Sequence, residues 1–233
     1  LLFPHHENEI AQSEAATGEK FANLWMHNGP LRVDSVKMSK SLDNFFTVRE
    51  VLKKYDAEVV RHLLIASHYR SPINYSELSL QQSTAALERL YIGLQGVDIE
   101  TAKSLTNSRF EKAFYKAMDD DFNTAEAFGV LFDLVKELNK EKSAGSELAG
   151  QLGALLVKLG ATLGVLQQKP EEFLQSSVNN DVDAEEVEGL IVARKQARAD
   201  KNWAKADEIR DKLAQLKVVV EDGADGSSWR IER

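Results

Sequence analysis

Apolar residues recur at three- and four-residue intervals through the middle of the sequence, and this pattern limits the folds open to the chain. After Ser76 come Leu80, Leu87, Leu90 and Leu94. Such spacing places side chains on one face of a helix. Residues 109–118, a segment from 123 to about 141, and 147–167 show the same recurrence. Several one-sided apolar helices bury their faces best against each other, so the sequence predicts a helical bundle.

Capping residues indicate where these helices begin. Thr47 is followed three residues later by Glu50, a capping box that predicts a helix from Val48. Asp56 precedes an apolar-faced segment that Ser71–Pro72 interrupts. Asn123 and Glu126 repeat the arrangement before the second bundle helix. The helical region should therefore extend from about residue 47 to 167.

The two ends of the chain are less regular. Residues 5–17 predict a helix that stops at Gly18, and residues 21–36 look irregular or extended. Residues 168–183 lose the periodicity and gather Gln, Pro, Ser and Asn, which is typical of a linker. Beyond it we expect two helices, at 184–199 and 202–216, and then two short strands, at 218–220 and 228–231.

Composition narrows the class of protein. Apolar residues make up 43% of the 233 residues, enough for a packed core, and the net charge of −8 argues against a general nucleic-acid coat. The absence of cysteine excludes disulfides and thiolate metal sites built by this chain alone, and fits a reducing cytoplasm. No apolar run approaches the roughly 20 residues that span a bilayer. Because the chain opens on Leu1 rather than methionine, we expect part of a longer protein.

Residues 37–41 read KMSKS, a polar segment with two lysines three positions apart. Attack of a carboxylate on the α-phosphate of ATP builds negative charge on the phosphates. Lys37 and Lys40 can approach that charge from a mobile loop as compact cations. Met38, Ser39 and Ser41 complete the candidate ATP-binding segment, in which small serines allow close backbone approach. The alternative is an ordinary solvated lysine loop.

This motif resembles the second ATP-binding loop of class I aminoacyl-tRNA synthetases, whose other motif, HIGH, does not occur here. Synthetases for methionine, valine, isoleucine and leucine share KMSKS. Residues 3–12, FPHHENEIAQ, together with Trp25–Gly29 and Asn44–Thr47, are similar to the cysteinyl-tRNA synthetases in particular. That resemblance implies joining of L-cysteine to tRNA(Cys) through cysteinyl-adenylate, with ATP and Mg²⁺.

The resemblance also implies a zinc ion that binds the substrate thiolate. His5 and Glu9 match two of its ligands, and the family's two cysteine ligands would lie outside this sequence. Imidazole and carboxylate are common zinc ligands, and a metal–sulfur bond explains rejection of serine. The alternative is a set of solvated polar residues at a helix start, and His6 is expected to be structural or to line the pocket.

A basic segment lies near the C-terminus. Residues 190–217 hold eight Lys or Arg against four acids, a local charge of +4. Alone this suits either an amphipathic surface or a face for phosphates. Residues 201–211 resemble the family's anticodon-binding domain. For the anticodon GCA, Asp207 suits guanine, Arg198 suits cytosine and Asp222 suits the adenine amino group. Trp203 is either a stacking platform or, as its apolar ring favours, a core anchor.

The resemblance implies a mostly α chain that starts at the end of a Rossmann-like catalytic domain. We expect that end at 1–46, a helical stem-contact region at 47–107, a bundle at 108–167, a linker at 168–183 and a small α/β anticodon-binding domain at 184–233. The family implies a cytoplasmic monomer. Two alternatives remain: a mycothiol-pathway ligase that joins cysteine to an amino sugar, and a non-catalytic module that binds tRNA or a partner.

Overall fold

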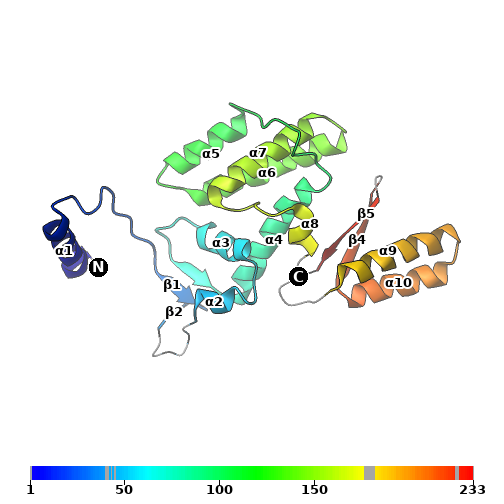
Figure 1. The fold of residues 1–233 in the computed structure, drawn as a ribbon, viewed down its shortest axis with the longest axis horizontal. Coiled ribbons are helices and arrows are strands. Elements are labelled where there is room, and N and C mark those ends of the chain that lie inside the picture. Colours follow the sequence, from blue (N-terminus) through cyan, green and yellow to red (C-terminus); the bar gives the residue numbers. More distant parts are fainter. Residues whose placement is uncertain are drawn as a thin grey trace.

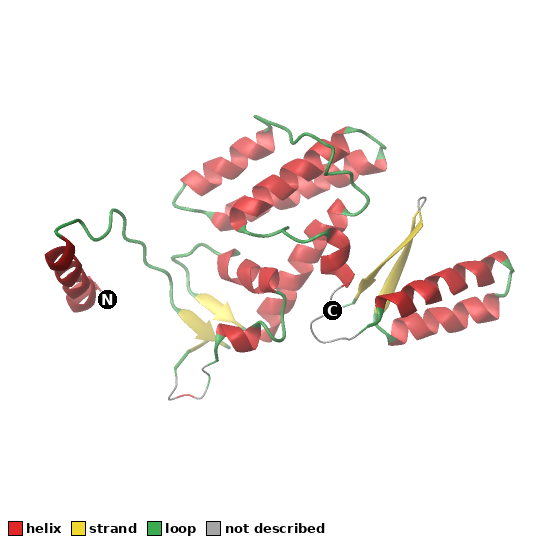
Figure 2. Cartoon of the chain, viewed as in Figure 1, coloured by secondary structure: helices red, strands yellow, loops and turns green. Residues whose placement is uncertain are grey.

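The computed structural model describes residues 2–39, 42, 44, 46–175, 182–223 and 226–232. It is mostly helical, as the periodicity predicts, and it also contains two small sheets (Figures 1 and 2). No helix in the described part of the chain combines the length and the apolar character needed to cross a membrane.

The bundle consists of α4 (Glu77–Leu94), α5 (Arg109–Asp119), α6 (Thr124–Ser143) and α7 (Leu148–Leu163), with the shorter α3 (Ala57–Ile65) against α4 (Figure 1). All four leucines predicted on the inner face of α4 are buried, at most 3% exposed. They share one core with leucines of α6 and α7. The helical bundle is therefore confirmed.

The predicted caps form the expected hydrogen bonds. At α2 (Val48–Val51) the Thr47 hydroxyl accepts from the Glu50 amide while the Glu50 carboxylate accepts from the Thr47 amide. Asn123 caps α6 by accepting from the Glu126 amide. These contacts satisfy amides that the helices cannot pair internally.

A three-stranded sheet precedes the bundle. Its order is β2 (Val36–Lys37), β1 (Leu31–Val33), β3 (Ile73–Tyr75), with β1 antiparallel to β2 and parallel to β3. Gly29, just before β1, allows the chain to lie close against residues 69–71, which precede β3. Its amide donates to the Tyr69 carbonyl, and a Cβ at this position would lie 2.1 Å from the Ser71 carbonyl oxygen. Any larger residue at Gly29 would push the two segments apart.

The N-terminal segment stands apart from the bundle (Figure 1). A π-helical turn, Leu2–His6, leads into α1 (Glu7–Thr17), which ends at Gly18 in the left-handed conformation as predicted. No residue of α1 is buried. Helix α1 therefore owes none of its position to the bundle core.

The C-terminal region has its own small core. Helices α9 (Ala184–Ala199) and α10 (Trp203–Gln215) pack together, and β4 (Val218–Gly223) pairs with β5 (Gly226–Ile231) in an antiparallel hairpin. The core includes Val187, Ile209, Leu213, Val218, Trp229 and Ile231. Both strands are longer than predicted because residues 221–223 and 226–227 continue the ladder.

The segment 168–183 is not uniformly a linker, contrary to expectation. Residues 170–175 form helix α8 (Pro170–Gln175), with Phe173 and Leu174 buried in the bundle core. A single helical turn is too short to show an apolar period, and only its contacts with α4 reveal it. Residues 176–181 lie outside the described part of the chain.

A buried imidazole lies within the bundle. His62 on α3 is 6% exposed, its ring lies 4.7 Å from that of Phe128, and no described residue forms a hydrogen bond with its Nδ1. Burial lowers the pKa of His62 from 6.5 to about 4, because the charged ring would lose its hydration. The folded chain therefore holds this imidazole neutral at physiological pH.

This burial makes stability depend on pH. The unfolded imidazole binds a proton near pH 6.5 and the folded one only near 4, so stability is complete above 6.5 and falls as the pH drops. We expect the bundle's free energy of unfolding to fall by about 2 kcal/mol from His62 alone between pH 7 and pH 5. His62→Leu should remove that part of the fall in urea titrations, and an unchanged pH dependence would contradict the assignment.

Candidate functional site

The KMSKS segment follows a tight hairpin. Asp34 and Ser35 adopt positive φ angles of 47° and 66° between β1 and β2, and the Ser35 amide donates to Asn74 Oδ1 at 2.7 Å. Lys37 ends β2 with an exposed side chain, and Met38 and Ser39 are half-buried. Lys40 and Ser41 lie outside the described residues. The hairpin thus delivers the first lysine of the motif to the surface.

Asn44 braces this segment in a way that the sequence did not indicate. Its Oδ1 accepts from the Ser39 amide at 2.8 Å, and its Nδ2 donates to the Lys37 carbonyl at 3.1 Å. One amide side chain supplies both a donor and an acceptor, which a lysine, whose ammonium group only donates, could not do at this position. Asn44 therefore holds the backbone on both sides of Met38.

His5 and Glu9, the candidate metal ligands, both lie exposed at the start of the chain. His5 belongs to the π-helical turn and Glu9 to α1, so a regular helix does not connect them. The described residues contain no group of three or more His, Cys, Asp or Glu side chains placed to hold a metal ion. Any metal held by His5 and Glu9 would thus need further ligands.

The His6 side chain is half-buried against two other rings. Its ring stacks on Trp25 and His27 with centroids 5.1 and 5.0 Å away, and His27 Nε2 lies 3.3 Å from His6 Nδ1. Partial burial, and then the neighbouring His27, lower the pKa of His6. These ring contacts join the turn before α1 to the segment Trp25–Gly29, so two of the stretches of sequence that carry the family resemblance lie together.

The candidate anticodon residues lie on the C-terminal helix pair. Arg198 is exposed near the end of α9, and Asp207 is exposed on α10, where its carboxylate pairs with Arg210 at 3.0 Å. Lys212 pairs with Glu186 of α9 at 3.0 Å. The local excess of positive charge is therefore partly neutralised by Glu186, an acid from outside the basic segment.

Trp203 is not a core anchor. Its side chain is 60% exposed at the first position of α10, whereas Trp229 fills the core at 4% exposure. The sequence alone could not rank the two tryptophans by burial, since this depends on how α10 and the hairpin pack together. Asp222 lies in β4 opposite Ser227, and its side chain is outside the described part of the structure.

The brace at Asn44 can be tested by amide exchange. Asn44→Ala removes two hydrogen bonds worth about 1 kcal/mol each, so exchange of the Ser39 amide should accelerate about 30-fold. Asn74→Ala is the matched control because it removes a hydrogen bond from the neighbouring hairpin turn only. Equal protection of Ser39 in the parent and in Asn44→Ala would show that the brace does not form.

Three family models match consecutive parts of the chain. Residues 1–85 match tRNA synthetases class I (C) catalytic domain, residues 113–167 match a DALR domain, and residues 183–230 match the cysteinyl-tRNA ligase anticodon binding domain. The matched regions contain the KMSKS segment, most of the bundle and the C-terminal helix pair with its hairpin.

Curated relatives are similar along the same stretch. The cysteine–tRNA ligases of Ectopseudomonas mendocina and Azotobacter vinelandii are each 57% identical over 231 residues, and that of Stutzerimonas stutzeri is 56% identical. These matches cover 99% of this chain and 50% of each relative, so the chain spans about half their length. Such identity, with three family regions in one chain, shows that the chain belongs to the cysteine–tRNA ligase family.

Proposed function

We propose that this chain is part of an enzyme that joins L-cysteine to tRNA(Cys) at the expense of ATP. Cysteine and ATP give cysteinyl-adenylate and diphosphate, and the cysteinyl group then passes to the terminal ribose of the tRNA with release of AMP. The observation that carries this proposal is the presence of catalytic-domain and anticodon-domain matches in one chain. The proposal assigns the complete reaction to a longer protein.

In this proposal Lys37 and Lys40 act on the ATP phosphates. Lys37 is exposed at the end of β2, and Asn44 holds the backbone beside it. Charge that develops on the phosphates is stabilised best by donors already in position, because their orientation costs nothing during the reaction. We assign Met38, Ser39 and Ser41 to the same ATP-binding segment, with Mg²⁺ accompanying the nucleotide.

We further propose that His5 and Glu9 supply two ligands to a zinc ion that selects cysteine by its sulfur. The donor set is suitable for zinc, and both side chains are exposed and can meet ligands from elsewhere. The remaining ligands would come from the half of the relatives' length that this chain does not span. The ring contacts of His6 with Trp25 and His27 support the placement of this segment.

On the RNA side, Arg198, Asp207 and Asp222 are proposed to read the edges of the anticodon bases. The exposure of Trp203 supports a stacking role, since an indole free on one face can receive an unstacked base. We place the enzyme in the cytoplasm as a monomer, by analogy with the family.

The alternative of a mycothiol-pathway ligase explains less of the chain. An enzyme that acts on an amino sugar has no need of an anticodon-binding region, yet residues 183–230 match one. A purely RNA-binding module would leave the KMSKS segment without a role. Even so, we expect this chain by itself to bind tRNA without activating cysteine, because the HIGH motif is absent.

The two lysines can be tested in the complete enzyme. Lys37→Ala with Lys40→Ala should lower cysteine-dependent pyrophosphate exchange at least about 100-fold, because at least one well-placed donor to the phosphates is lost. Lys20→Ala, which changes an exposed lysine near α1, should leave the exchange rate within about twofold. Activity retained after both motif lysines are neutralised would remove the proposed role of the loop.

Anticodon reading can be tested with this chain alone. Arg198→Ala should weaken binding of tRNA(Cys) by about 1–3 kcal/mol and reduce discrimination against a tRNA with a changed anticodon. Arg198→Lys is the matched control, since it keeps the charge but loses the planar fork. We expect it to retain phosphate attraction and to lose discrimination. Unchanged discrimination in both variants would exclude Arg198 from base reading.

A further inference from the structure

A buried carboxylate joins the start of α3 to the segment that leaves the bundle. Glu58 is 6% exposed and accepts hydrogen bonds from the Tyr91 hydroxyl at 2.8 Å and from the amides of Leu166 and Gln167 at 2.8 and 2.9 Å. Among the described residues no lysine or arginine pairs with it. A carboxylate removed from water needs such donors, so these three contacts are the condition for its burial.

The backbone that receives Glu58 is unusual for its sequence. Leu166 adopts a positive φ of 61° although it is not a glycine. In this conformation two successive amides face one carboxylate, an arrangement that forms an anion-binding concavity. The Leu166 side chain is buried and packs on Gly160, where a Cβ would lie 2.9 Å from Leu166 Cδ1. Packing and the carboxylate together hold a turn that leucine disfavours.

The contacts continue along residues 164–175, which we call the strap. Gln168 Nε2 donates to the Asp56 carboxylate at 3.1 Å, and the Gln168 amide donates to the Tyr91 hydroxyl at 3.3 Å. The Tyr91 ring stacks on Phe173 of α8 with centroids 4.1 Å apart. Thus the first turn of α3 and one tyrosine of α4 hold the strap from Leu166 to α8.

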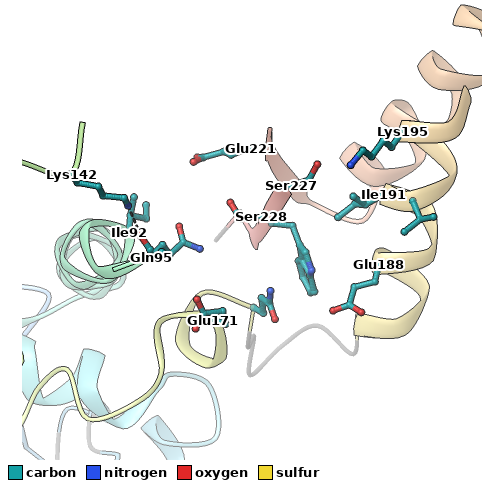
Figure 3. A pocket seen from close by; sticks show the side chains of 14 residues that line it. Ile92, Gln95, Lys142, Glu171, Glu188, Ile191, Lys195, Glu221, Ser227 and Ser228 are labelled. Atoms are coloured by element: carbon teal, nitrogen blue, oxygen red, sulfur yellow. Dashed lines mark hydrogen bonds between the residues drawn. The ribbon is translucent and has the colours of Figure 1, made fainter. Parts of the chain in front are cut away.

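The strap then meets the C-terminal region. Contacts between the bundle side and residues 182–232 concentrate where α8 packs on β5 (Figure 1). Beside this contact a cavity of about 620 Å³ separates the two parts (Figure 3). Gln95 and Lys142 line the bundle side, and Lys195, Glu221 and Ser228 line the opposite side. Since the neighbouring surfaces are held apart, the docking of α8 sets where the C-terminal region lies.

We propose that Glu58 is a positioning residue that, through the strap, fixes the C-terminal helix pair relative to the part of the chain that carries KMSKS. This inference rests on the proposed function, in which one tRNA must reach both parts. Glu58 touches neither ATP nor RNA in this proposal. It acts by holding Leu166 and Gln167, and with them α8 and β5.

The absence of cysteine allows a direct measurement of this arrangement. Spin labels on Lys136→Cys of α6 and Glu208→Cys of α10, both exposed positions, report the distance between the two parts. We expect one narrow distance distribution in the parent. Glu58→Gln should broaden it, because the amide nitrogen would face a backbone N–H. Amide exchange of residues 166–175 should accelerate about tenfold or more, as two hydrogen bonds are weakened.

Glu111→Gln is the matched control. Glu111 also accepts a backbone amide, that of Asn107, and a side-chain donor, Lys158, but it lies on α5 away from the strap. This variant should destabilise the bundle without broadening the distance distribution. If both variants broaden it equally, or if neither does, the effect is one of general stability and the proposal is overturned.

Binding of tRNA(Cys) connects the strap to function. If only about one molecule in ten of the Glu58→Gln variant keeps the docked arrangement, its affinity for tRNA(Cys) should fall about tenfold. The affinity of Glu111→Gln should stay within about twofold of the parent. Should Glu58→Gln fail to fold, Tyr91→Phe removes one donor and should shift every readout in the same direction. A parent chain that does not prefer tRNA(Cys) would refute the proposed function, whereas the label distances decide the role of Glu58 without RNA.

Discussion

The burial of α4 is the interaction on which the rest of the structure depends. This helix packs against α3, α6, α8 and β3, so it joins the small sheet, the bundle and the strap. Four of its leucines are almost completely buried. Truncation of one buried leucine typically costs 2–5 kcal/mol, and a domain is stable by only about 5–15 kcal/mol. Two such losses in α4 would therefore remove most of the stability that holds the candidate loop and the strap.

The candidate chemistry lies at the margin of this core. Lys37 follows a hairpin whose β1 strand also pairs with β3, and β3 packs on α4. Asn44 orders the backbone of Lys37 and Ser39 through two hydrogen bonds, at a place that the buried core does not cover. This division suits the proposed approach of the loop to a nucleotide, because a fully buried segment could not move and an unbraced one would lose its orientation.

The charge of the C-terminal helix pair differs from that of the chain as a whole. The chain is acidic overall, yet the basic helix pair retains exposed cations, and some of these are paired with acids such as Asp207 and Glu186. A general electrostatic attraction for RNA would therefore be weak. In the proposed function, discrimination between tRNAs would come from a few directed contacts, in which individual side chains of this pair read bases.

Local rules predicted much of the fold. The capping box at Thr47, the N-cap at Asn123, the inner face of α4 and the stop at Gly18 follow from bonds and periods within a few residues. The KMSKS segment and the family resemblance were likewise readable from adjacent residues. Helix α8 was not, since one turn carries no period and its buried Phe173 shows its role only against Tyr91.

The sequence by itself therefore determined the mostly helical fold class, the helix starts and the KMSKS motif on which the proposed ATP chemistry rests. Tertiary structure alone decided that Trp203 faces solvent while Trp229 fills a core. It also decided that Asn44 braces the loop and that Glu58 meets amides more than a hundred positions away. The physical reason is that caps and periods are short-range properties of the chain. Burial and the pairing of polar groups depend on segments that meet only after folding.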